Sequence, residues 1–281
     1  MHTIATTNEM QAYANRLISR KKSIAFVPTM GFLHEGHLSL MREGRKRGDV
    51  LVVSIFVNPT QFGEGEDFDS YPKDLERDLE LARKENVDVV FTPDKVSLYE
   101  NGFQTYVNLE KLPKHLCGIS RPIFFQGVAT VVTKLFNIVK PSVAIFGQKD
   151  YQQLAVIKRM VRDLNFDIEI VGAPTVREPD GLAMSSRNNY LKPEERLAAL
   201  SLFESLSKAQ NLCAEGVLDS DRIINEVKKL IHSHKDSKID YISICDPDTL
   251  EDIKTIESPV VMALAVKVGK TRLIDNMIIN Y

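Results

Sequence analysis

Short apolar segments alternate with amphipathic segments from the start of the chain to about Val171. The apolar segments are nearly continuous, as in Val50–Val57, which is typical of parallel strands covered on both faces. This alternation predicts a Rossmann-like, doubly wound α/β domain with a parallel sheet. The expected strands cover residues 23–28, 50–57, 87–91, 142–146 and 167–171.

The segments between these strands repeat apolar residues every three or four positions, which is the spacing of helices packed on a sheet. We expect helices over 35–47, 72–86, 128–139 and 151–164. An earlier helix is predicted after Thr6, which has the spacing of a capping box with Glu9. Its apolar face would contain Met10, Ala14, Leu17 and Ile18.

The order of elements changes after about residue 176. Two predicted helices, 193–213 and 220–234, come before β-like segments at 239–245 and 260–268 and a last apolar stretch at 273–279. Such an order is typical of a second, smaller α+β domain at the C-terminal end. We therefore expect one domain over 1–176 and another over 177–281. In the second helix, we expect an apolar stripe to be core; it is formed by Ile223, Ile224, Val227, Leu230 and Ile231.

Composition excludes several classes of protein. The 281 residues carry a net charge of −2, so no basic surface for nucleic acid or anionic membrane is expected. No signal peptide is recognisable, and no apolar run is long enough to span a bilayer, which predicts a cytoplasmic protein. The three cysteines are widely spaced and form no CxxC pair, so we expect packing or incidental exposure rather than disulfides or zinc binding.

The first candidate site is His34-Glu-Gly-His37, an HxGH pattern between a predicted strand and a predicted helix. At that junction, backbone N–H groups and the positive end of the helix dipole attract anions such as phosphate. Gly31 and Gly36 would let a ligand approach the backbone. A zinc site is a rival interpretation, but no third ligand has a suitable spacing. Two partly exposed loop histidines are the other alternative.

Two later segments add groups suited to phosphate and ribose. Gly147-Gln-Lys-Asp150 follows an apolar strand, and its lysine can reach a phosphate while its aspartate can accept from ribose or cap the next helix. Met184-Ser-Ser-Arg187 supplies two hydroxyls and a guanidinium within four residues. Taken alone, a polar loop of this kind is more often simply solvated.

Together, HxGH and the Met-Ser loop resemble the HIGH and KMSKS motifs of the class I aminoacyl-tRNA synthetase and nucleotidylyltransferase superfamily, whose members attack an α-phosphorus. Here Ala183 and Ser186 stand where KMSKS has lysines. The missing positive charge would have to come from Lys149 and Arg187.

A closer resemblance, to the pantothenate synthetase family, covers nearly the whole chain. It is carried by six ordered segments: Pro28–His37, Phe56–Gly63, Tyr71–Asp74, Phe125–Val132, Phe146–Gln153 and Met184–Asn188. The resemblance implies ATP-dependent condensation of pantoate with β-alanine through a pantoyl adenylate. It also implies a Rossmann-like domain, a smaller C-terminal lid domain and a homodimer.

The resemblance further implies roles for individual residues. His37, His34, Lys149 and Arg187 would be catalytic, with His37 the residue usually given a proton-donor role. ATP would be bound by Met30, Gly31, Phe32, Leu33, His34, Glu35, Gly36, His37, Gly147, Gln148, Lys149, Asp150, Val176, Met184, Ser185, Ser186 and Arg187. Pantoate would be bound by Gln61 and Gln153, and β-alanine by Gln61.

Some assignments remain open at this level. Mg²⁺ should be held mainly by ATP oxygens, with Asp78 as a candidate protein ligand, although a solvated position on the helix after Pro72 explains that residue equally well. Asn58 and Arg121 lie in motif loops beside the expected pocket, whereas Phe124 and Phe125 are expected to pack. Another adenylyl- or nucleotidyl-transferring enzyme is the alternative function, and a non-catalytic ATP-binding module is a weaker one.

Overall fold

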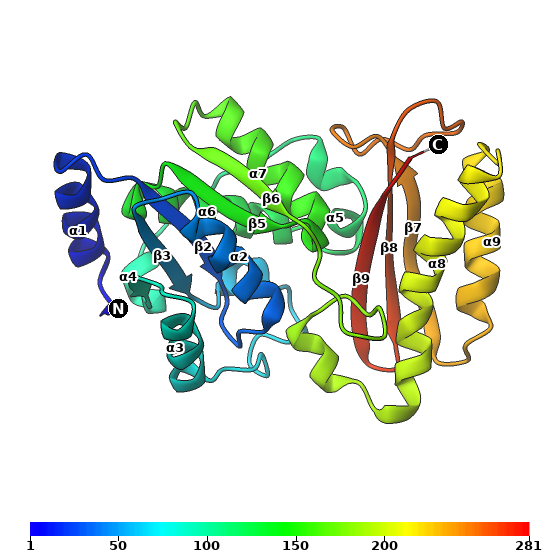
Figure 1. The fold of residues 1–281 in the computed structure, drawn as a ribbon, viewed down its shortest axis with the longest axis horizontal. Helices are drawn as coiled ribbons and strands as arrows, with labels where there is room; N and C mark the ends of the chain where they lie inside the picture. The colour runs from blue at the N-terminus through cyan, green and yellow to red at the C-terminus, as the bar shows by residue number, and fades with distance from the viewer. Residues whose placement is uncertain (281) are drawn as a thin grey trace. The chain divides into compact units, whose positions relative to one another are not determined.

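The computed structural model describes residues 1–280, which form two compact units (Figure 1). The first unit contains Met1–Leu109, Ile123–Gln148 and Gln153–Pro174. The second unit contains Glu110–Pro122, Lys149–Gln152 and the chain from Thr175 onward. Two short segments thus belong to the second unit although the chain on either side of them belongs to the first.

The first unit is built on a six-stranded parallel sheet in the order β1-β4-β3-β2-β5-β6. Its strands are β1 (His2–Ile4), β2 (Ile24–Thr29), β3 (Val50–Ile55), β4 (Val89–Phe91), β5 (Val143–Gly147) and β6 (Glu169–Ala173). All paired strands are parallel, which confirms the predicted doubly wound sheet. β1 was not predicted, because three residues are too few to display a period.

Helices on both faces cover the sheet. The longer ones are α1 (Thr7–Ser19), α2 (Glu35–Arg45), α3 (Leu75–Lys84), α6 (Phe124–Val139) and α7 (Tyr151–Asp163). α3 begins later than expected because the carboxylate of Asp74 accepts the N–H of Arg77 and caps the helix there. α6 begins at Phe124, earlier than expected, and no side chain caps it. Two single-turn helices, α4 (Lys95–Leu98) and α5 (Cys117–Ser120), were not predicted.

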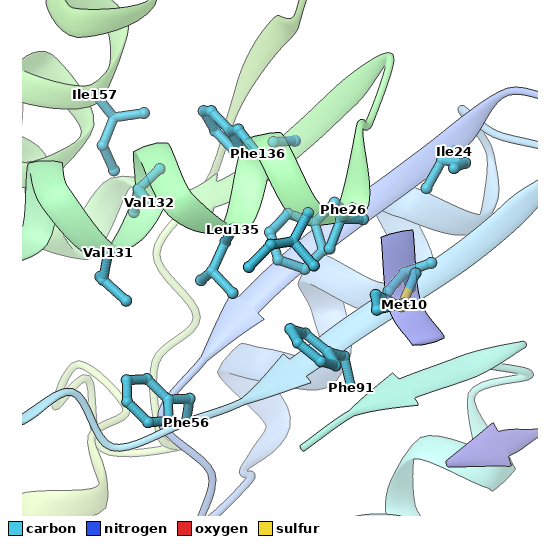
Figure 2. Packing of buried hydrophobic residues seen from close by; sticks show 14 of the residues in the cluster. Met10, Ile24, Phe26, Phe56, Phe91, Val131, Val132, Leu135, Phe136 and Ile157 are labelled. Carbon is cyan, nitrogen blue, oxygen red and sulfur yellow. The ribbon is translucent and has the colours of Figure 1, made fainter. Parts of the chain in front are cut away.

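Alternate residues of the central strands belong to two separate cores. Ile24 and Phe26 of β2 pack into one core with residues of α1, α6 and α7, including Met10, Val132, Phe136 and Ile157 (Figure 2). Ala25 and Val27 face the opposite core, which contains residues of α2 and α3. Covering both faces explains why these strands are apolar almost without interruption.

The first helix confirms most of its predicted pattern. Thr6 caps it by accepting the N–H of Glu9 at 3.3 Å, and Met10 and Ala14 are fully buried. Leu17 packs against the core from a partly buried position. Ile18, however, is 48% exposed, so its assignment to the buried face was wrong. Eight positions after Met10, it lies at the margin of the apolar stripe.

The second unit contains an antiparallel sheet in the order β7-β8-β9, with strands Ser237–Cys245, Val260–Val268 and Thr271–Ile279. Helices α8 (Arg196–Ala214) and α9 (Ser220–His232) pack on it. Three members of the predicted stripe, Ile223, Val227 and Ile231, are fully buried there. Ile224 packs against this core from a partly buried position, and Leu230 is also only partly buried. This confirms the smaller α+β unit.

Cys117, Cys213 and Cys245 are all buried as free thiols, so they serve packing. Within residues 1–280, no helix combines the length and the hydropathy needed to cross a membrane.

The carboxylate of Asp49 ties the start of β2 to the start of β3. It accepts the backbone N–H of Ser23 at 2.9 Å, the Ser23 hydroxyl at 3.0 Å and the Lys22 ammonium at 3.1 Å. All three donors favour the ionised carboxylate and lower the pKa of Asp49 to about 2, with the backbone hydrogen bond as the largest cause.

Because the folded-state pKa of Asp49 is depressed, its contribution to stability is present above about pH 4 and is lost as the pH falls toward the folded-state pKa of about 2. We expect Asp49→Asn to lower the free energy of unfolding at neutral pH and to approach the wild type near pH 2. Urea unfolding at several pH values measures this difference. Exposed Asp167→Asn is the control, and a gap between Asp49→Asn and wild type that does not change with pH would contradict the prediction.

Candidate active site

Two of the predicted phosphate-binding segments follow neighbouring strands at the point where the sheet reverses its order. From β2 the chain proceeds through β3 to β4 on one side, whereas β5 and β6 lie on the other side (Figure 1). β2 and β5 are paired directly, through Ala25 with Val143 and Phe26 with Ala144. In open parallel sheets, ligands bind beyond the carboxyl ends of the strands at such a switch point. Met30–His37 and Gly147–Gln148 therefore begin where a ligand site is expected.

His34 and His37 shape the start of α2. His34 is the N-cap, and its Nδ1 accepts the N–H of Gly36 at 3.2 Å. The N–H of His34 in turn donates to Nδ1 of His37 at 3.3 Å, and the two ring centroids lie 4.1 Å apart. Since both Nδ1 atoms accept, the neutral rings carry their protons on Nε2. Each imidazole is therefore a hydrogen-bond donor at Nε2.

The loop before His34 has a backbone that side chains hold in place. Gly31 and Phe32 have positive φ angles of 82° and 50°. The Thr29 hydroxyl accepts the N–H of Gly31 at 3.2 Å, and the Asp78 carboxylate accepts those of Phe32 and Leu33 at 2.7 Å each. Protein acceptors thus engage the N–H groups of residues 31–33. The N–H groups that the sequence suggested for phosphate are those of the next residues, in the first turn of α2.

Residue 31 must be glycine for two reasons: its φ angle is positive, and there is no room for a Cβ atom. A Cβ at this position would lie 2.9 Å from Cγ2 of Ile55 and 3.0 Å from Oδ2 of Asp78, closer than side chains normally approach. A positive φ is also strained for a residue with a side chain. Phe32 adopts such an angle despite its side chain, which marks the loop as a strained segment that its surroundings must stabilise.

Asp78 is buried at 1% exposure, so the interpretation as a solvated helix residue was wrong. Burial raises the pKa of its carboxyl, while the N–H groups of Leu33 and Phe32 act in the opposite direction. Both carboxylate oxygens already serve the loop. Within residues 1–280 there is also no cluster of three or more His, Cys, Asp or Glu side chains that would hold a metal ion. These contacts give Asp78 a structural task in holding the loop.

Glu35, another predicted ATP contact, forms an ion pair with Arg42, which also binds Glu85 at 2.6 Å. The carboxylate of Glu35 is therefore directed along α2, toward Arg42. Only the backbone of Glu35 is suited to a negatively charged phosphate.

Gln61 and Asn58 follow β3, on the short 3-10 helix η1 (Pro59–Gln61) and at its N-cap. Both are buried, with 7% and 1% exposure. Nδ2 of Asn58 donates to Oε1 of Gln61 at 3.1 Å, and Nε2 of Gln61 donates to the sulfur of Met30 at the same distance. The structure therefore brings Gln61 beside the loop that leads to HxGH. Gln153 lies half-buried in the first turn of α7.

Gly147 ends β5, and a Cβ built there would meet no atom within 4 Å. Gln148 comes next and opens the 3-10 helix η3 (Gln148–Asp150). The half-buried backbone after β5 is thus open to close approach by a ligand.

In the second unit, Lys149 and Asp150 are held beside β9. The carbonyl oxygen of Lys149 accepts from the side-chain amide of Asn276 at 2.7 Å. The Lys149 ammonium lies 3.7 Å from the Asp150 carboxylate, and its side chain is 20% exposed. This anchoring fixes the backbone of Lys149 and leaves its side chain partly accessible.

The Met184–Arg187 segment begins at a narrow hairpin. The N–H of Met184 donates to the carbonyl of Val176 at 3.0 Å, which brings these two predicted ATP contacts side by side. Ser185 then caps η4 (Ser186–Tyr190) by accepting the N–H of Arg187 at 3.2 Å, and Ser186 is buried at 6% exposure. The segment is therefore ordered by its own hydrogen bonds and is not a simple solvated loop.

Charged residues that the sequence did not single out hold this hairpin. Arg177 forms a two-point ion pair with the buried Asp275 of β9, at 2.6 and 3.0 Å, and its guanidinium lies 4.2 Å from the Phe203 ring centroid. Arg196 binds Glu178 and Asp180 at 2.6 Å each. Arg177 and Asp275 are 98 positions apart, so no local pattern could have paired them.

Comparisons with known proteins agree with this arrangement. The family model described as Pantoate-beta-alanine ligase matches residues 2–278. Pantothenate synthetases of Desulfatibacillum aliphaticivorans and Thermotoga petrophila are each 56% identical over 280 residues, covering 100% of both chains.

Two solved structures extend the likeness to three dimensions. The pantothenate synthetase from Thermus thermophilus has a TM-score of 0.94 and 43% identity, with 99% of each chain covered. The pantoate-beta-alanine ligase from Francisella tularensis, in complex with beta-gamma ATP and beta-alanine, has a TM-score of 0.82 and 34% identity, covering 99% of this chain and 97% of that one. Because the match spans essentially the whole chain, the chain belongs to the pantoate-beta-alanine ligase family.

Proposed function

We propose that the chain joins (R)-pantoate to β-alanine at the expense of ATP, giving pantothenate, AMP and pyrophosphate. The proposal rests on one observation, the full-length match to the ligase family at 56% identity. The position of HxGH at the switch point of the sheet is the structural feature that supports it.

In the first step, a carboxylate oxygen of pantoate attacks the α-phosphorus of ATP, and the bond to the β-phosphate breaks to release pyrophosphate. In the second step, the amine of β-alanine attacks the acyl carbon of pantoyl adenylate. The carbon–oxygen bond to AMP breaks, and the amine loses a proton. Neither step needs a covalent bond to the enzyme, so positioning and charge stabilisation are the tasks left to the protein.

The charge of each proposed site residue indicates which of these two tasks it serves, stabilising phosphate charge or orienting a substrate. We propose that Nε2–H of His34 and His37, together with Lys149 and Arg187, stabilises the phosphate charge. Gln61 and Gln153 would hold pantoate, and Gln61 also β-alanine, because a neutral amide orients a carboxylate without neutralising it. Gly147, Asp150, Val176 and the Met184–Ser186 backbone would contact the nucleotide.

Mg²⁺, a homodimer and a cytoplasmic location are proposed from the family resemblance. The described residues do not build a metal centre of their own, and Asp78 is engaged by the loop. Mg²⁺ would therefore arrive on the ATP oxygens and keep most of its waters.

Pantoate-dependent exchange of pyrophosphate into ATP tests the function, because exchange requires formation of an adenylate. We expect exchange with ATP, Mg²⁺ and pantoate, and release of AMP when β-alanine is added. Folded protein that shows no pantoate-dependent exchange would exclude the proposed function.

His37→Ala and Lys149→Ala test the phosphate-binding groups. Losing a charge-assisted hydrogen bond to the transition state should lower the rate of adenylation by about 100-fold or more. The midpoint of thermal unfolding should change little. Exposed Lys158→Ala is a control for Lys149, and near-wild-type exchange in either site variant would remove that residue from the catalytic set.

Asp78→Asn tests what holds the Gly31–Leu33 loop. The amide can accept with one atom only, so one buried backbone N–H loses its acceptor at a cost of about 1–3 kcal/mol. We expect a lower unfolding midpoint and a raised KM for ATP, and no change in Glu80→Gln, an exposed position on the same helix. If Asp78→Asn instead raises only the Mg²⁺ concentration needed for activity, Asp78 is a metal ligand.

A further inference from the structure

A buried group of polar side chains surrounds η1 in the first unit. Asn58 is its centre, and its Nδ2 donates to Oε1 of Gln61 and to the carbonyl of Gly127, at 3.1 Å each. Its Oδ1 accepts from the hydroxyl of Tyr99 at 2.9 Å, the hydroxyl of Thr60 at 3.0 Å and the N–H of Thr60 at 3.4 Å. Both ends of the Asn58 amide are thus engaged.

Two of these partners have a fixed hydrogen-bonding role, one as acceptor only and one as donor only. The Gly127 carbonyl can only accept, so it requires the nitrogen of the Asn58 amide. The Thr60 N–H can only donate, so it requires the oxygen. Turning the amide of Asn58 by half a turn would break both interactions, and its orientation is therefore determined.

The orientation of Asn58 determines that of Gln61. Since Nδ2 of Asn58 is a donor, the atom of Gln61 that faces it must be the oxygen. The nitrogen of Gln61 then points to the Met30 sulfur at 3.1 Å. A thioether is a weak acceptor, so a carboxylate or hydroxyl oxygen of a substrate would be a stronger partner for this nitrogen.

Tyr99 completes the group from the C-cap of α4. Its ring is held edge-on by Phe103 at a centroid distance of 5.0 Å, and the Lys134 ammonium lies 5.7 Å from the ring centroid. Burial raises the pKa of the Tyr99 hydroxyl, so this group keeps its proton. The packing fixes the ring, and its hydroxyl donates to the oxygen end of Asn58, which adds to the orientation set by Gly127 and Thr60.

Gly127 permits the close approach on the other side. A Cβ at this position would lie 2.3 Å from the carbonyl oxygen of Thr60 and 2.6 Å from the nitrogen of Gln61. Any side chain would push α6 away from η1. The carbonyl that orients Asn58 therefore reaches it only because residue 127 is glycine.

We propose that Tyr99 and Gly127 are positioning residues that act through Asn58 to turn the donor end of the Gln61 amide toward the substrate. The site then selects an oxygen acceptor, such as the carboxylate or hydroxyl of pantoate, at this position. This inference rests on the proposed function, because it takes Gln61 as a ligand of pantoate.

Tyr99→Phe removes the hydroxyl and keeps the ring. We expect the KM for pantoate in the exchange assay to rise about threefold to tenfold, the effect of one neutral hydrogen bond, while the KM for ATP stays unchanged. Tyr106→Phe makes the same chemical change at a half-exposed ring that packs on Phe103, and should behave as wild type. Equal KM values for pantoate in Tyr99→Phe and wild type would overturn the role of Tyr99.

Asn58→Asp and Asn58→Ala separate amide orientation from simple packing. Aspartate keeps the shape but no longer presents an N–H to Gln61, so the Gln61 nitrogen would turn toward it and the oxygen would face pantoate. Alanine imposes neither orientation on the Gln61 amide. We therefore expect the KM for pantoate to rise more in Asn58→Asp than in Asn58→Ala. A KM for pantoate that rises more in Asn58→Ala than in Asn58→Asp would overturn the inference.

The outcomes of these experiments show whether a failure concerns this inference alone or also the proposed function on which it rests. Absence of pantoate-dependent exchange in folded wild-type protein would exclude both. Wild-type exchange combined with unchanged Tyr99→Phe, or with the reversed order at Asn58, would exclude the inference alone. Thermal unfolding of each variant, measured alongside, ensures that the KM values are compared among folded proteins.

Discussion

The direct parallel pairing of β2 with β5 is the constraint on which the rest of the first unit depends. Because β3 and β4 continue on one side and β6 on the other, the connections that leave β2 and β5 run in opposite directions. The carboxyl ends of these two strands are therefore left beside each other and open. This backbone pairing alone places the HxGH loop and Gly147–Gln148 at the same edge of the sheet. No contact between side chains of the site is needed for that.

Within that location, the loop is shaped by acceptors that the protein itself supplies. Thr29, Asp78 and His37 accept N–H groups of residues 31–34, so the backbone there is satisfied without a ligand. Satisfying it in this way stabilises the positive φ angles of Gly31 and Phe32. The imidazoles of His34 and His37 then remain as side chains of this loop that can donate to an anion.

The sequence predicted those features of the structure that are determined by the local pattern of residues. Strands covered on both faces are apolar throughout, so β2, β3 and β5 were recognisable. The HxGH pattern at a strand-to-helix junction indicated a candidate site at the edge of the same sheet. Contacts across long sequence separations were not predictable in the same way. Asp78 lies 45 positions from Leu33, and on its own helix it has no feature that distinguishes a solvated carboxylate from a buried one. Arg177 and Asp275 present the same difficulty.

The placement of charge follows the two chemical tasks of the proposed reaction. A carboxylate that must attack phosphorus loses nucleophilicity if an arginine neutralises it, and a buried arginine would in turn need its own counter-ion. Asn58 and Gln61 avoid both costs, because neutral amides can be buried once all their partners are in place. Lys149, the cation proposed to bind phosphate, stays partly exposed and lies 3.7 Å from the Asp150 carboxylate, so its charge is partly hydrated and partly paired. The chain thus buries its neutral amides and leaves this cation partly exposed beside the Asp150 carboxylate, in keeping with their different desolvation costs.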